Sequence, residues 1–341
     1  MVDNPLNRRS RIVVLGTGGT IAGKASATGD NVGYVAGQIG VADMLHGIDA
    51  PPGVVLVTEQ IAQLDSKDMD AATWQTLALR CAAWLAEADV VGVVVTHGTD
   101  TLEETAFFLQ CVLAPMKPIV LVSAMRPSTA LAPDGPQNLR DAIAVAATPG
   151  ARGVCAVAAG AVHGAHDVRK VQTYRLDAFD SGDAGVLGYV EEEVLRRLRD
   201  WPESDRDAAR RRFEAMARMP PANWPRVEIV TSHAGTDGRL VDLLVRENAM
   251  GAPADRLHGL VVASTGNGTV HRDLQAAALR AQAAGIAVLR ATRCAGGRIV
   301  SPPGEEEAVP GESARLRSAN DLTPVKARIA LLLELIGSRD A

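Results

Sequence analysis

Short apolar runs rich in valine and isoleucine alternate with helical patterns through the first part of the chain. Continuous apolar runs of this kind are typical of strands that are covered on both faces. They predict strands at residues 11–15, 54–57, 90–95, 118–122 and 153–158. Helical spacing of apolar residues predicts helices at 69–88, 102–113 and 137–147. Because strands and helices alternate, we expect right-handed crossovers and a mainly parallel sheet with flanking helices.

A polar, glycine-rich stretch at 161–188 interrupts this pattern and predicts hairpins and loops at a domain edge. The alternation resumes further along, with strands at 227–231, 259–263 and 287–291 and helices at 238–248, 274–284 and 325–336. A charged stretch punctuated by prolines separates the two regions and is typical of a linker. We therefore predict an α/β protein with two domains. These are a larger N-terminal domain over 1–195, a linker over 196–225 and a smaller C-terminal α/β domain over 226–341.

Composition and charge exclude several classes of partner. The net charge of −5 over 341 residues gives no electrostatic reason to expect nucleic acid or an anionic membrane. Basic residues at 196–218 are interleaved with acidic ones, which indicates a solvated amphipathic helix. The polar start of the chain lacks the apolar core of a secretory signal, and no apolar run could span a bilayer. We therefore expect a cytoplasmic protein.

The four cysteines predict buried free thiols. They lie in apolar periodic segments without CxxC spacing, at Cys81, Cys111, Cys155 and Cys294. His163 and His166 form a histidine pair with Asp167, but the spacing fits no helical ligand pair and Gly164 favours a turn. We therefore expect no metal and no cofactor.

Two hydroxyl-rich turns follow strands and carry the candidate chemistry. Residues 96–101 read Thr-His-Gly-Thr-Asp-Thr after an apolar run, and residues 16–22 read Gly-Thr-Gly-Gly-Thr-Ile-Ala after another. Ligands bind at the carboxyl edge of open parallel sheets, where both turns should lie. A threonine hydroxyl is a weak nucleophile and needs a base or a polarising network. The two turns together predict a site in which threonine is a reactant.

Other interpretations of these turns are weaker. A dinucleotide fingerprint needs glycine at the position of Ile21, and no lysine follows as a phosphate-binding loop requires. A tight structural turn remains an alternative for residues 16–23. We interpret His97 as a strand-end histidine whose ring is satisfied by the backbone, not as a catalytic base.

The motifs of this chain resemble the bacterial-type L-asparaginase (asparaginase/glutaminase) family. The matches begin with TGGTIA at 17–22 and HGTDTLEET at 97–105. Others follow in order over nearly the whole chain: DSKDM at 65–69, SAMRPS at 123–128, DGPQNL at 134–139, HDVRK at 166–170, GVLGY at 185–189, GNG at 266–268 and PVKAR at 324–328.

The resemblance implies an amidohydrolase that acts in two displacement steps without a metal or cofactor. By this likeness Thr17 is the nucleophile, Tyr34 is the tyrosine of a mobile loop that contacts it, and Thr99, Asp100 and Lys170 form the activating set. The resemblance also implies that Ser66 binds the substrate α-carboxylate, Asp100 binds the α-ammonium, and the backbone of Ala124 contacts the scissile amide. Thr99 belongs to the same substrate-binding set. The implied form is a homotetramer of intimate dimers with the site at a subunit interface.

Two departures from the family pattern bear on the substrate. Many secreted members carry glutamine where this chain has Lys67, and a lysine there would oppose a substrate ammonium at close range. Our hypothesis is that Lys67 leaves asparagine hydrolysis intact and disfavours glutamine. The acid that a neighbouring subunit contributes should lie at 301–318, where four residues compete: Glu305, Glu306, Glu307 and Glu312. Asn267 resembles the asparagine at the subunit interface.

We therefore predict an L-asparaginase that converts L-asparagine to L-aspartate and ammonia through a threonine acyl-enzyme. One alternative is an amidohydrolase for glutamine, D-asparagine or a succinamic-type acid. A second is the tRNA-linked amidotransferase subunit that shares this core, which the net acidity disfavours. A third is a ligand-binding module without catalysis.

Overall fold

The computed structural model describes residues 9–27, 29–250, 256–300 and 315–338. The chain divides into two compact units, Met1–Arg210 and Arg211–Ala341. This division falls inside the stretch at 196–225 that we predicted as a linker, and helix α5 (Arg206–Arg218) crosses it. Helix α5 agrees with the amphipathic helix that we predicted for the basic residues at 196–218.

The first unit contains an eight-stranded sheet in the order β12-β11-β8-β7-β6-β5-β1-β4. Pairing is parallel from β4 to β7 and antiparallel from β7 to β12, so the predicted mainly parallel sheet is confirmed. The strands are β1 (Ser10–Gly18), β4 (Val54–Leu64), β5 (Val90–Thr96), β6 (Ile119–Val122), β7 (Val154–Ala158), β8 (Ala161–Gly164), β11 (Gly188–Glu191) and β12 (Val194–Arg197).

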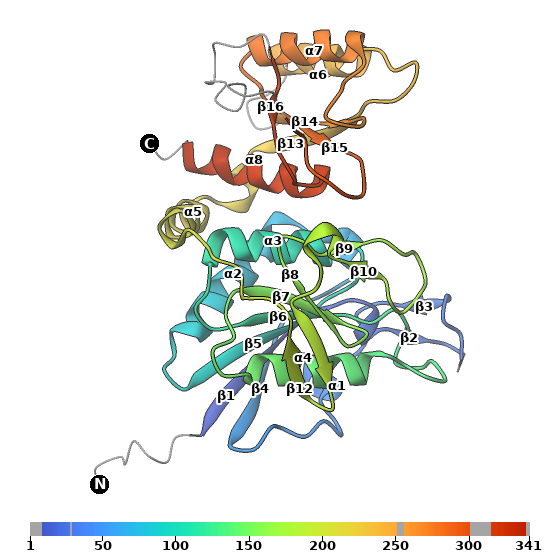
Figure 1. Ribbon diagram of the computed structural model, residues 1–341, viewed down its shortest axis with the longest axis vertical. Coiled ribbons are helices and arrows are strands. Elements are labelled where there is room, and N and C mark those ends of the chain that lie inside the picture. The colour runs from blue at the N-terminus through green and yellow to red at the C-terminus, as the bar shows by residue number, and fades with distance from the viewer. Residues whose placement is uncertain (1–8, 28, 251–255, 301–314, 339–341) are drawn as a thin grey trace. The chain divides into compact units, whose positions relative to one another are not determined.

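Helices cover both faces of this sheet, with α2 and α3 on one side and α1 and α4 on the other (Figure 1). Their bounds are Val41–Met44 for α1, Ala71–Ala86 for α2, Leu102–Leu113 for α3 and Gly135–Ala147 for α4. The valine-rich strands β1, β5, β6 and β7 are buried almost throughout, as their continuous apolar runs predicted.

Most element boundaries differ from those predicted by a few residues, and two of the differences have a clear local reason. Helix α2 begins at Ala71, not at residue 69, because the Asp70 carboxylate accepts a hydrogen bond from the Thr73 backbone N–H and caps the helix. Strand β4 continues past Val57 to Leu64. It lies at the sheet edge, where alternating polar residues are tolerated, and no continuous apolar run marks the part of the strand after Val57.

Two small antiparallel ribbons extend from the first unit. Strand β2 (Lys24–Ala25) pairs with β3 (Tyr34–Val35) near the end of β1. Strand β9 (Arg169–Lys170) pairs with β10 (Phe179–Asp180), which brings Lys170 opposite Phe179. Both ribbons belong to stretches in which the sequence predicted loops or hairpins.

The second unit is a smaller α/β layer. Its parallel sheet runs β13-β14-β15-β16, with α6 and α7 on one face and α8 on the other (Figure 1). The bounds are β13 Arg226–Thr231, β14 Leu257–Ser264, β15 Ala287–Thr292, β16 Arg317–Ser318, α6 Arg239–Met250, α7 Arg272–Ala283 and α8 Pro324–Ser338. The predicted α/β fold of this region is confirmed.

The cysteine prediction is wrong at one position. Cys81 and Cys155 are buried, and burial raises the pKa of the Cys155 thiol to about 12. Cys111 is half-buried. Cys294 is exposed, because it follows the end of β15 on a turn where its backbone N–H donates to the Thr292 hydroxyl.

Candidate active site

Three turns converge at the carboxyl ends of β1, β4 and β5. Gly18 and Gly19, which end β1, have φ of +106° and +83°, a region that favours glycine. A Cβ atom on Gly19 would lie 2.3 Å from the backbone nitrogen of Gly98, and one on Gly18 would lie 2.4 Å from the carbonyl oxygen of Leu64. The glycines therefore allow the first threonine turn to approach the second one directly.

Thr17 is the last residue but one of β1 and is 1% exposed. Its hydroxyl donates a hydrogen bond of 2.8 Å to the carbonyl oxygen of Thr96 at the end of β5. In the described state the Thr17 proton is thus held by backbone, while the oxygen keeps its lone pairs. This side chain is rigidly placed between two neighbouring strands.

Lys170 joins the second turn from the β9–β10 ribbon. Its ammonium donates to the Thr99 hydroxyl over 2.8 Å and forms an ion pair of 2.5 Å with Asp100. Thr99 is 6% exposed, whereas half of the Asp100 side chain is accessible. The three residues predicted to form the activating set are therefore in direct contact.

Ser66 lies under the same turn, in the 3₁₀ segment η3 (Ser66–Asp68) that follows β4. Its hydroxyl accepts a hydrogen bond from the Asp100 backbone N–H over 3.2 Å, and its carbonyl accepts one from the Thr101 hydroxyl over 2.8 Å. A Cβ atom on Gly98 would lie 2.4 Å from this hydroxyl. Ser66 and Asp100 are thus adjacent, as residues for the two ends of one amino acid would need to be.

The described contact of Tyr34 differs from the one that the resemblance implied. The tyrosine hydroxyl lies 2.7 Å from the hydroxyl of Thr20, not against Thr17. Thr20 begins the short 3₁₀ segment η2 (Thr20–Ala22), and the Tyr34 ring packs close to Gly23 just beyond it. Sequence reasoning missed Thr20, although the same glycine turn carries both threonines.

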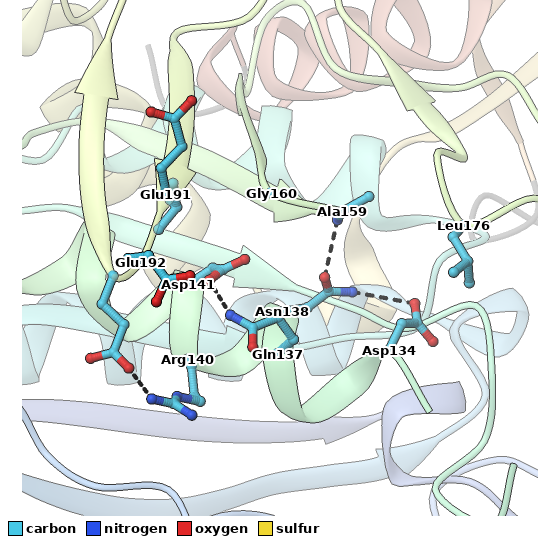
Figure 2. Close-up of a pocket in the computed structure, with 12 residues that line it drawn as sticks. Asp134, Gln137, Asn138, Arg140, Asp141, Ala159, Gly160, Leu176, Glu191 and Glu192 are labelled. Carbon is cyan, nitrogen blue, oxygen red and sulfur yellow. Dashed lines mark hydrogen bonds and ion pairs between the residues drawn. The ribbon is translucent and has the colours of Figure 1, made fainter. Parts of the chain in front are cut away.

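Ala124 follows β6 and is 2% exposed. Helix α4 fixes the loop after it: the Asp134 carboxylate accepts from the backbone N–H groups of Met125 and Arg126 at 2.9 Å each. Asn138 donates to the Ser123 carbonyl and to Asp134, and accepts from the Ala159 N–H (Figure 2). Asn138 belongs to the DGPQNL motif at 134–139, and its role in holding this loop follows from the structure.

A cavity of about 580 Å³ lies between α4, the turn that joins β7 to β8, and the β11–β12 hairpin (Figure 2). Carboxylates dominate its lining, which consists of Asp134, Gln137, Asn138, Arg140, Asp141, Ala159, Gly160, Leu176, Val190, Glu191, Glu192 and Glu193. Within this lining, Gln137 donates to Asp141, and Arg140 forms an ion pair with Glu193. None of the predicted site residues lines this cavity, so it is separate from the threonine turns.

Lys67 points its charge at acidic neighbours. Its ammonium donates to Asp65 at 2.8 Å and to Asp68 at 3.1 Å, and the side chain is 61% exposed. The hydrogen bond that Lys67 donates to Asp65, followed by the one that it donates to Asp68, raises the pKa of the ammonium. The two carboxylates offset the positive charge that we expected to oppose a substrate ammonium.

His97 is structural, as predicted. Its Nδ1 donates to the Gly98 carbonyl at 2.7 Å, so its Nε2 accepts from the Thr105 hydroxyl at 2.9 Å, which in turn accepts from the Trp74 indole N–H. Burial lowers the pKa of the ring to about 4. Both nitrogens are occupied, and the ring has no free position for a substrate.

In the second unit, Asn267 uses both polar atoms of its amide on the backbone of Val300, at 2.9 Å and 2.7 Å. The candidates for the intersubunit acid, Glu305, Glu306, Glu307 and Glu312, lie outside the described residues. Over the ranges that the structure describes, no group of three or more His, Cys, Asp or Glu could hold a metal. In the same ranges, no helix has both the length and the apolar character needed to cross a membrane.

Comparisons with known proteins agree along the whole chain. A family profile described as Asparaginase, N-terminal matches residues 11–202, and one described as Glutaminase/Asparaginase C-terminal domain matches residues 226–340. L-asparaginase 2 of Bacillus subtilis is 33% identical over 334 residues, which cover 96% of this chain and 83% of that protein. Glutaminase-asparaginase of Pseudomonas fluorescens is 31% identical over 335 residues, or 97% and 88% of the two chains.

A solved structure is also similar. The crystal structure of a probable cytoplasmic L-asparaginase from Campylobacter jejuni aligns with a TM-score of 0.82 and 33% sequence identity. The alignment covers 96% of this chain and 95% of that one.

Proposed function

This chain belongs to the asparaginase family, as its motifs predicted, and on that premise we propose that it is an L-asparaginase. We propose Thr20 as its nucleophile in place of Thr17, because the Tyr34 hydroxyl contacts the Thr20 hydroxyl, whereas Thr17 directs its proton to a backbone carbonyl. The turn that holds both threonines approaches, through Gly19 and Gly98, the turn on which Lys170 contacts both Thr99 and Asp100. This approach supports a site in which a weak nucleophile is served by a polar set able to move a proton.

The reaction proceeds in two displacements. In the first, the Thr20 oxygen bonds to the side-chain amide carbon of asparagine, its proton passes to the leaving nitrogen, and the C–N bond breaks to release ammonia. In the second, water adds to the resulting ester, the bond to Thr20 breaks, and the threonine oxygen regains a proton. Tyr34 contacts the nucleophile from the β2–β3 ribbon, and Thr99 and Lys170 serve as the proton relay.

Substrate orientation is assigned to the floor of the site. Ser66 binds the α-carboxylate, the accessible side of Asp100 receives the α-ammonium, and the backbone beside Ala124 contacts the amide. This assignment is supported by the hydrogen bond between the Ser66 hydroxyl and the Asp100 backbone N–H. The hypothesis that Lys67 disfavours glutamine belongs to the same proposal. Glutamine is the competing substrate to compare, because the Pseudomonas fluorescens relative is a glutaminase-asparaginase.

Ammonia release from a panel of amides tests the function. We expect efficient hydrolysis of L-asparagine, less of L-glutamine, and none by Thr20→Ala, whose circular dichroism should match the parent. A Thr20→Ala protein that retains substantial turnover, with turnover lost in Thr17→Ala, would refute the assignment and return the role to Thr17. A parent that prefers D-asparagine or a succinamic-type acid would replace the substrate and keep the chemistry.

We further propose a homotetramer in the cytoplasm, with a partner subunit supplying an acid to the site. The location is supported by the Campylobacter jejuni structure, which is of a probable cytoplasmic L-asparaginase. Light scattering after size exclusion tests the assembly, and fractionation of the source cells tests the location. A monomer with full activity would exclude the contribution from a partner.

A further inference from the structure

His163 is a buried polar residue that the proposed chemistry does not use. It lies on β8 opposite Ala156 of β7 and is 3% exposed. Its Nδ1 lies 2.9 Å from the hydroxyl of Ser181, which is itself 5% exposed. A hydrogen bond between two buried side chains, 18 residues apart, ties the inner strand β8 to the segment that follows β10.

The segment between these two residues carries Lys170. It leaves β8 at Gly164, whose carbonyl accepts from the backbone N–H groups of Asp167 and Val168. It then forms β9, in which Lys170 pairs with Phe179 of β10, two residues before Ser181. The His163–Ser181 hydrogen bond therefore closes a ring of chain whose far side presents the lysine to Thr99 and Asp100.

The ribbon itself is too short to be stable alone. Strands β9 and β10 have two residues each, and isolated two-stranded hairpins are marginal in water. Its position therefore depends on its attachments to the rest of the unit. Buried Val168 and Ala178 and the ion pair between Asp167 and Arg199 hold its body and its first end, and the Ser181 side chain ties its second end to β8.

We propose that His163 is a positioning residue for the proposed amidohydrolase: through Ser181 it holds the β9–β10 ribbon so that the Lys170 ammonium reaches Thr99 and Asp100. The inference rests on the proposed function, because Lys170 matters there as part of the proton relay. The lysine contacts are short, at 2.8 Å and 2.5 Å, so a shift of the ribbon by about 1 Å would break them.

Three variants separate positioning from packing. His163→Phe keeps an aromatic ring beside Phe179, whose centroid lies 6.5 Å away, but removes the ring nitrogens. His163→Asn loses ring volume but places a polar atom where the histidine has Nδ1. Ser181→Ala removes the partner hydroxyl with the smallest change in volume and guards against a folding failure at His163.

We expect His163→Phe and Ser181→Ala each to lower kcat for asparagine by roughly ten- to a hundredfold, with KM changed by less than about twofold. Their double mutant should be no worse than either alone, because both remove one interaction. His163→Asn should recover most of the kcat although its thermal midpoint falls. A purely structural role predicts the opposite order, with activity following stability.

A second readout does not depend on turnover. The rate at which acetic anhydride modifies Lys170, followed by peptide mass spectrometry, should rise in His163→Phe and Ser181→Ala and return in His163→Asn. Unchanged kcat and unchanged Lys170 reactivity in both variants would overturn the proposal. If the parent hydrolyses no amide, the proposed function fails, and the modification rates still decide whether His163 positions the lysine.

Discussion

Gly19 offers a sharp test of how closely the two threonine turns approach each other. In Gly19→Ala the new Cβ atom would lie 2.3 Å from the Gly98 nitrogen and 2.4 Å from its Cα. Both are backbone atoms of the turn that carries Thr99, so no flexible side chain can move aside. The substitution must separate the turns, and the separation acts on the proposed chemistry directly.

Gly47→Ala is the matched control. Gly47 has φ of +80°, close to the +83° of Gly19, but no atom lies within 4 Å of its added Cβ. Both residues have positive φ, and Gly19, with ψ of −177°, occupies a region that is essentially restricted to glycine and costs other residues about 1–3 kcal/mol. Gly19→Ala adds the cost of overpacking a buried site, about 1–3 kcal/mol more. The difference between the two variants therefore measures the clash together with any strain that is particular to the Gly19 backbone.

Urea unfolding and asparagine kinetics provide the assay. We expect Gly47→Ala to retain parental kcat/KM and Gly19→Ala to lose roughly a hundredfold, since about 1 Å of misplacement costs that much. The excess loss of unfolding free energy in Gly19→Ala should be at least the overpacking cost of about 1–3 kcal/mol. Equal stability of the two variants, or parental kcat/KM in Gly19→Ala, would show that the turns do not approach as described.

The remaining predictions concern the relay, the specificity and the acid limit of stability. Thr99→Val should lower kcat at least about a thousandfold in asparagine assays, because the Lys170 ammonium needs a hydroxyl partner. Thr99→Ser keeps that hydroxyl and should retain part of the parental kcat, so equal activities in the two variants would contradict the relay. Lys67→Gln should raise glutamine hydrolysis relative to asparagine hydrolysis, and Lys67→Met is the control that removes the charge without adding an amide. An unchanged ratio of the kcat/KM values for the two substrates would count against the hypothesis. Burial lowers the pKa of His97 and His163 from 6.5 to about 4, so the folded state favours the neutral rings and their contribution is complete above pH 6.5. As the pH falls from 6.5 to 4, the free energy of unfolding should decrease by up to about 3 kcal/mol for each ring, and NMR titration that finds both rings protonating near pH 6.5 would refute this.

Much of the fold was predictable because its centre is apolar. The strands at 11–15 and 90–95 were recognised from continuous valine and isoleucine runs, which is how strands buried on both faces appear in a sequence. Edge elements were less visible. Strand β4 was predicted over only four of its 11 residues because the remainder, up to Leu64, is partly polar and lies at the open edge of the sheet.

The grouping of the site residues was also predictable, since parallel topology brings the ends of β1 and β5 to one edge. Contacts made by loops were not. Lys170 reaches Thr99 over 71 residues of sequence through a ribbon that has two residues in each strand, and no local pattern marks that ribbon. Its assignment came from resemblance alone. The surroundings of Cys294 were misjudged for a related reason, because the apolar run before it ends at a turn.

The orientation of the threonine hydroxyls lies beyond any sequence pattern, and it bears on how the reaction begins. Thr17 directs its proton to the Thr96 carbonyl, and Thr20 is paired with Tyr34. Both arrangements depend on side-chain torsions, which the glycine turn permits but does not specify. The backbone carbonyl that holds the Thr17 proton cannot act as a base, whereas the Thr20 hydroxyl faces a phenol that can accept or pass on a proton. The reaction can therefore begin at Thr20 without turning a buried threonine away from its partner, and the contribution of Tyr34 is to orient the Thr20 hydroxyl.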